Sequence, residues 1–80
     1  MVHSIHITYC SKCGTSRRVV DLIDREIKIL QTDPDFEIKL VDIKGALPVI
    51  LINGRQLECD YKNYKAILYA FRSEIEALKN

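Results

Sequence analysis

The sequence predicts a small α/β domain with a mixed four-stranded sheet, in which a β-α-β unit is followed by a β-hairpin and a C-terminal helix. Three observations support this prediction. Short apolar runs alternate with two long segments of helical periodicity, Asn53-Gly54 separates two of the runs, and 80 residues suffice for one such unit. We therefore expect a single domain over residues 1–80, in the order β-α-β-β-β-α.

The first half of the chain has the pattern of a strand, a helix and a second strand. Residues 5–9 alternate between two faces, and apolar residues at spacings of three and four predict an amphipathic helix over residues 19–30. Residues 36–43 predict the second strand. Because apolar side chains occur on both faces of this segment, we expect it to be covered on both sides. Strands that flank a helix in this way pair in parallel.

The second half has the pattern of a hairpin and a helix. Pro48 opens an apolar run that ends at Asn53-Gly54, and Leu57 resumes the apolar pattern. Asn-Gly favours a tight hairpin turn because both turn residues need positive φ. A proline is tolerated at the first residue of a strand. Apolar residues at helical spacing then predict a final helix over residues 64–78.

Composition narrows the classes of partner. The chain has 12 Lys and Arg against 11 Asp and Glu, a net charge of +1, with no basic patch. This balance gives no electrostatic reason to expect nucleic acid or an acidic membrane as a partner. No apolar run approaches the ~18 residues of a membrane helix, and the N-terminus enters a strand pattern instead of a signal peptide. We therefore expect a cytoplasmic protein.

Cys10 and Cys13 stand between the first strand and the first helix, and two cysteines at this spacing can close a small disulfide ring. We expect the first thiol to lie at the helix N-terminus, where unpaired amides stabilise a thiolate. Lys12, Arg17 and Arg18 add positive charge nearby. Cys10 is therefore the expected nucleophile, which attacks a target disulfide, and Cys13 the thiol that resolves the mixed disulfide.

The same two thiols allow a metal site, which is the alternative to redox chemistry. Thiolates are ligands for copper, zinc and iron–sulfur clusters. Structural zinc needs four ligands, and the spacing of His3, His6 and Cys59 matches no common zinc pattern. Small copper-carrying domains also begin with a strand, Cys-x-x-Cys and a helix. They end in a strand, however, and usually have methionine where Thr8 stands here. We therefore expect no resident metal, and the alternative function is a metal-binding or metal-transfer module that uses the same cysteines.

Residues 47–54, Leu-Pro-Val-Ile-Leu-Ile-Asn-Gly, resemble the stretch of glutaredoxins that contains their cis-proline. Together with the Cys-x-x-Cys pair, this stretch makes the chain similar to the thioredoxin-like superfamily. The resemblance implies a minimal thioredoxin-like fold and a thiol–disulfide oxidoreductase that needs no organic cofactor. It implies that Pro48 is cis, that its loop lies beside the cysteines, and that Leu47 presents its backbone to a substrate. Protein disulfides or small thiols would be substrates, and a reductase or thiol reductant would supply electrons.

The chain also departs from glutaredoxins. It lacks their helix between the second and third strands, and Leu-Glu-Cys-Asp stands where they have the Gly-Gly pair that helps to hold glutathione. The resemblance therefore gives no support for glutathione as the partner.

The shortened layout is similar to the selenoprotein W-like family, whose Tyr-Cys-x-x-Cys start is matched by Tyr9 to Cys13. The expected substrate-side residues are Tyr9, Lys12, Leu47 and Pro48, although Tyr9 also fits a simple continuation of the strand face. We interpret Cys59, near the end of the fourth predicted strand, as a small residue that fills a strand position, with a third redox thiol as the alternative.

Overall fold

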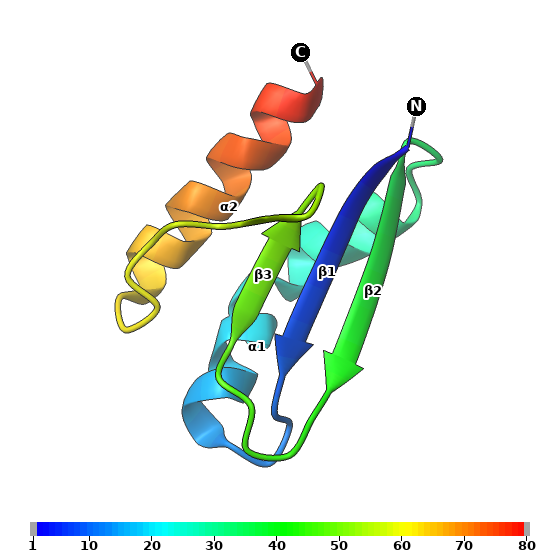
Figure 1. The fold of residues 1–80 in the computed structure, drawn as a ribbon. Helices are drawn as coiled ribbons and strands as arrows, with labels where there is room; N and C mark the ends of the chain where they lie inside the picture. Colours follow the sequence, from blue (N-terminus) through cyan, green and yellow to red (C-terminus); the bar gives the residue numbers. More distant parts are fainter. Residues whose placement is uncertain (1, 80) are drawn as a thin grey trace.

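The computed structural model describes residues 2–79, and its element order is the predicted one (Figure 1). The elements are β1 (His3–Tyr9), α1 (Gly14–Gln31), β2 (Phe36–Asp42), β3 (Val49–Ile52), β4 (Arg55–Gln56) and α2 (Tyr64–Lys79). The strands form one four-stranded sheet in the order β2-β1-β3-β4. This layout is that of a minimal thioredoxin-like fold.

The sheet is mixed, as predicted, because β1 lies between a parallel and an antiparallel neighbour. It pairs in parallel with β2, where Ile5 is opposite Ile38, and antiparallel with β3, where Ile5 is opposite Ile52. The parallel pair runs to Tyr9 opposite Asp42, so the carboxyl ends of β1 and β2 lie side by side. The residues that follow β1 therefore meet the residues that end β2.

Both helices pack on one face of the sheet, and the core lies between them and the strands (Figure 1). The apolar faces of the strands and helices supply the fully buried side chains. The largest of these are Ile5, Ile7, Val19, Ile23, Ile27, Leu30, Ile50, Ile67 and Phe71.

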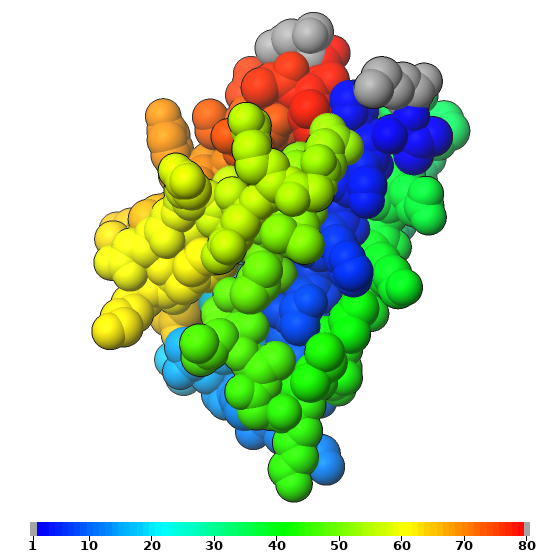
Figure 2. Space-filling view, viewed as in Figure 1, coloured from blue at the N-terminus to red at the C-terminus, as the bar shows by residue number. Residues whose placement is uncertain are grey.

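The other face of the sheet carries no helix, and Figure 2 shows β1 and β2 open to view on it. The expectation that β2 is covered on both faces is wrong. It is an edge strand in which only Phe36 is buried, and Leu40 is 41% exposed. The reason is that residues 43–48 join β2 to β3 directly, so the chain provides no helix for this face.

The Asn53-Gly54 hairpin is confirmed, with φ of 54° at Asn53 and 82° at Gly54. Asn53 also ties the turn to the sheet. Its side-chain Oδ1 accepts a hydrogen bond from the Ser4 N–H at 2.8 Å, and its own N–H donates to the Ser4 carbonyl at 2.7 Å. Because β4 ends at Gln56, Cys59 lies in the following loop, and the prediction that it fills a strand position is wrong.

Replacing Gly54 by alanine is expected to destabilise the protein by about 1 kcal/mol or more, because a Cβ disfavours positive φ. No neighbouring atom lies within 4 Å of the added Cβ, so the effect would come from the backbone alone. Gly14→Ala is the matched control, since Gly14 has the same free space without a positive φ. Urea unfolding of both variants tests this, and equal midpoints would contradict it.

Neither helix of the described chain is long and apolar enough to cross a membrane.

Candidate functional site

Cys10 and Cys13 begin and end the loop that joins β1 to α1, called the dithiol loop below (residues 10–13). A turn brings them together, since the Cys13 N–H donates to the Cys10 carbonyl at 3.2 Å. The two Sγ atoms lie 2.6 Å apart, with the Cys13 thiol donating to Cys10, and both cysteines are free. Sulfur atoms this close can form a disulfide without a large movement of the backbone.

The two thiols differ in their relation to the helix and to solvent. Helix α1 begins at Gly14 with Cys13 as its N-cap, so the expectation that the first thiol lies at the helix N-terminus is wrong. The turn uses the residues between the cysteines, which places Cys10 before the helix. Cys10 is 0% exposed, whereas Cys13 is partly exposed.

A second loop reaches the buried thiol. The β2–β3 loop (residues 43–48) passes beside the dithiol loop at one end of the sheet (Figure 1). In it, the N–H of Gly45, a residue with φ of 78°, donates to the Cys10 Sγ at 3.2 Å. The contact between Gly45 and Cys10 therefore confirms the expectation that the loop of Pro48 lies beside the cysteines.

The expected cis bond at Pro48 is wrong, because no peptide bond between residues 2 and 79 is cis. That expectation came from the family resemblance alone, and the trans form is the favoured one for an X–Pro bond. The Leu47 side chain is 80% exposed, and Pro48 is partly buried.

Two further residues, for which no role was predicted, hold the dithiol loop through hydrogen bonds. The buried Ser16 of α1 accepts the Cys10 N–H on its Oγ at 2.9 Å. The carboxylate of Asp42 accepts two hydrogen bonds from Ser11, from the N–H at 2.9 Å and from the hydroxyl at 2.6 Å. The role of Asp42 could have been predicted, because it is a polar residue at the carboxyl end of a strand, and the carboxyl ends of adjacent parallel strands meet at one edge of a sheet.

Hydrogen bonds make the two thiols unequal. The pKa of Cys10 is lowered, first by the Cys13 thiol that donates to it and then by the Gly45 N–H, and burial opposes this shift. The pKa of Cys13 is raised, first because it donates to Cys10 and then by burial, with a further contribution from the charge of Asp42. The pair therefore favours a Cys10 thiolate beside a protonated Cys13.

Two of the three cations that were expected to stabilise the thiolate, Arg17 and Lys12, have other neighbours, and Arg18 is exposed. Arg17 lies 3.8 Å from Asp21 on the exposed face of α1. Lys12 is exposed, and its charge helps to lower the pKa of Asp42, after the larger effect of the Ser11 hydrogen bonds. The lowering of the Cys10 pKa thus comes from hydrogen-bond donors and not from these side chains.

The remaining candidates lie apart from these contacts. Tyr9 is partly buried and packs against the core. Cys59, in the loop after β4, has a pKa raised first by burial and then by the charge of Asp60. Among residues 2–79, no group of three or more His, Cys, Asp or Glu side chains is placed to hold a metal ion.

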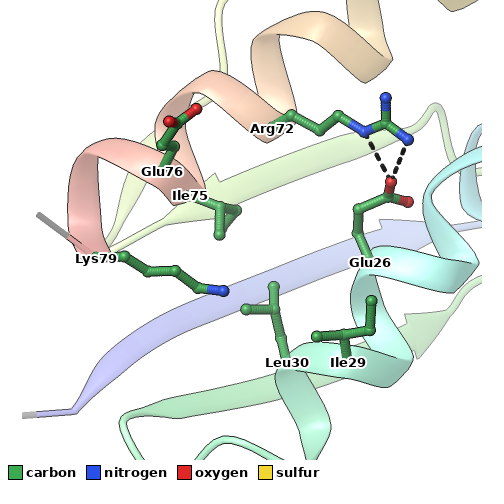
Figure 3. A pocket seen from close by; sticks show the side chains of 7 residues that line it. All are labelled: Glu26, Ile29, Leu30, Arg72, Ile75, Glu76 and Lys79. Carbon is green, nitrogen blue, oxygen red and sulfur yellow. Dashed lines mark hydrogen bonds and ion pairs between the residues drawn. The ribbon is translucent and has the colours of Figure 1, made fainter.

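A pocket between α1 and α2 contains none of the candidate residues (Figure 3). Its floor is apolar, and the ion pair of Arg72 with Glu26, at 2.7 Å, closes one side. We therefore place the candidate site at the two loops and not in this pocket.

The thiol pKa shifts predict an order of ionisation. Because the pKa of Cys10 is lowered and that of Cys59 is raised, thiolate absorbance in the ultraviolet should appear first from Cys10 as the pH rises. Absorbance suits this test because it reads the thiolate itself and needs no reagent to reach the buried sulfur. Cys10→Ser should remove the first step and Cys59→Ser should leave it. A first step that survives Cys10→Ser would contradict the assignment.

Comparison with known proteins supports the fold. No family model matches the chain, and no curated protein matches it. A crystal structure of a protein from Bordetella parapertussis, a structural genomics target, is similar with a TM-score of 0.58 and 22% identity. The match covers 92% of this chain and 99% of that one. The two proteins therefore share the fold over nearly their whole lengths.

Proposed function

We propose that this protein is a thiol–disulfide oxidoreductase or redox carrier of the thioredoxin-like superfamily, with Cys10 and Cys13 as its redox pair. The observation that supports this most is the 2.6 Å contact between the two free thiols, with Cys10 accepting hydrogen bonds from Cys13 and from Gly45. Donors aimed at one sulfur favour its thiolate, which is the reactive form in disulfide exchange.

The reaction runs through two exchanges. The Cys10 thiolate attacks a substrate disulfide, R–S–S–R′, so that Cys10 forms a mixed disulfide with R–S and R′–S leaves as a thiolate. Cys13 then loses its proton and attacks the Cys10 Sγ, which releases R–S as a thiolate and forms the Cys10–Cys13 disulfide. The substrate gains two electrons, and a reductase or a thiol reductant returns the protein to its dithiol form. No step uses an organic cofactor.

Access to Cys10 determines how the substrate binds. Because Cys10 is 0% exposed, the first attack requires the Cys13 side chain or the Gly45 segment to move aside. Leu47 and Pro48 are on the same loop as Gly45, and the backbone of Leu47 would pair with a protein or small-thiol substrate there. Lys12, exposed on the dithiol loop, and Tyr9, at the end of β1, would complete the substrate side.

We also propose a cytoplasmic location, since free cysteines persist in a reducing compartment. The balanced charge supports a partner that is neither nucleic acid nor a membrane.

A single-turnover exchange tests the function. Reduced protein carrying Cys59→Ser is mixed with one equivalent of an aromatic disulfide whose released thiolate is coloured. We expect two aromatic thiolates to be released per protein, and mass mapping should find a disulfide between Cys10 and Cys13. Release of one thiolate, with a mixed disulfide that persists, would contradict the proposal.

The alternative, a metal-binding or metal-transfer module, uses the same thiols. Metal content distinguishes it from the redox proposal. Metal analysis is performed on the protein purified under reducing conditions, with Cys10→Ser beside it. Stoichiometric copper, zinc or iron that disappears in the variant would favour the alternative. The redox proposal predicts equal, substoichiometric metal in both.

A further inference from the structure

The end of β2 and the loop after it are joined to the end of β1 and to the dithiol loop at three points. The Ile43 N–H donates to the Tyr9 carbonyl at 2.8 Å, which extends the parallel ladder by one bond. The Asp42 carboxylate accepts both hydrogen bonds of Ser11. A turn then follows, closed by the Ala46 N–H donating to the Ile43 carbonyl at 3.0 Å, and the Gly45 N–H inside it points at Cys10. The contact between Gly45 and Cys10 therefore depends on where β2 ends relative to the dithiol loop.

We propose that Asp42 is a positioning residue, whose carboxylate clamps the dithiol loop to the end of β2 and so keeps the Gly45 N–H on the Cys10 sulfur. This inference rests on the proposed function. The clamp is specific, because one carboxylate receives both the N–H and the hydroxyl of the same residue, and a charged acceptor strengthens both bonds. Asp42 touches neither sulfur through a hydrogen bond, so it acts through Ser11 and the two loops.

The charge of Asp42 by itself works against thiolates. It raises the pKa of Cys13, and Lys12 is the cation that lies near enough to affect the carboxylate. An acidic residue is useful here because its two carboxylate oxygens can accept both hydrogen bonds from Ser11. Alanine removes both the acceptor and the charge, whereas asparagine removes the charge and keeps one oxygen for the Ser11 N–H. These two substitutions separate position from charge.

The experiment compares Asp42→Ala, Asp42→Asn and Ser11→Ala with Glu37→Gln, all in the Cys59→Ser background. Glu37 is an exposed carboxylate on the same strand, which makes it the matched control. Each variant is titrated by thiolate absorbance, and its single-turnover exchange rate is measured with the aromatic disulfide.

For Asp42→Ala we expect the first thiolate step to move to higher pH and the exchange rate to fall roughly ten- to a hundred-fold, as for other misplaced reactive groups. Ser11→Ala should change the pH of the first thiolate step and the exchange rate in the same directions, but by less than Asp42→Ala does. Asp42→Asn should retain most of the rate and move the second step, that of Cys13, to lower pH. Glu37→Gln should match the parent.

Three results would overturn the inference. An Asp42→Ala variant that titrates and reacts like the parent removes the positioning role. An Asp42→Ala variant with a lower urea midpoint and an unchanged thiolate titration shows a role in stability alone. If Asp42→Ala does not fold, the urea midpoint and thiolate titration of Ser11→Ala are compared with those of the parent instead. If the parent shows neither an early thiolate step nor exchange, the proposed function fails and the inference fails with it. In the first two cases an active parent leaves the proposed function standing, so only the inference fails.

Discussion

Replacing Cys10 by serine is expected to reduce two-electron exchange to the uncatalysed level while the fold is retained. Serine is close to cysteine in size, and its hydroxyl can still accept the hydrogen bonds from Cys13 and Gly45. It cannot form a disulfide, however, and its hydroxyl is a poor nucleophile without an adjacent base. The variant should therefore keep the urea midpoint of the parent to within a small margin and lose the Cys10–Cys13 disulfide.

The partner substitution separates the two steps. Cys13→Ser should trap the mixed disulfide on Cys10, because the resolving thiol is gone, and should release one aromatic thiolate per protein. Cys59→Ser is the control, since Cys59 lies in the loop after β4 and should leave both steps intact. If Cys10→Ser still turned over like the parent, or if Cys59→Ser lost exchange, the assignment of the redox pair would be wrong.

The second large effect concerns the core. Phe71 of α2 is 0% exposed and is the largest fully buried side chain, so Phe71→Ala should cost about 3–5 kcal/mol in free energy of unfolding. Native proteins have a total stability of roughly 5–15 kcal/mol, so this loss is a large share of the total and should lower the urea midpoint markedly.

The matched control for Phe71→Ala is Tyr69→Ala on the same helix. Tyr69 is 77% exposed, so its removal should change the free energy of unfolding by no more than about 0.5 kcal/mol. Urea unfolding followed by circular dichroism compares the two variants. Similar midpoints would show that α2 does not pack on the sheet through Phe71.

The fold was predictable from the sequence because its signals are local. Periods of two and of three to four residues mark the strands and helices, and Asn53-Gly54 marks the hairpin. Periodicity does not show which faces of the strands are covered by helices and which are exposed to solvent. The apolar residues on both sides of β2 suggested two covered faces, but the direct connection to β3 leaves one of them open.

The candidate site was predictable only in part. The spacing of Cys10 and Cys13 made their contact expected, because a short loop brings them together. The donors that act on Cys10 come from outside this loop, since Gly45 is 35 residues away in sequence and its N–H carries no sequence signal. Arg17, by contrast, is close to the cysteines in sequence, but it pairs with Asp21 along the exposed face of α1.

The most direct test of this account is an equilibrium redox titration of the Cys59→Ser protein in mixtures of reduced and oxidised dithiothreitol, read by mass mapping of the cysteines. We expect one reversible two-electron transition between the free thiols and a disulfide that joins Cys10 to Cys13 within one chain. A protein whose thiols stay free across the range, or that forms only disulfides between chains, would contradict it.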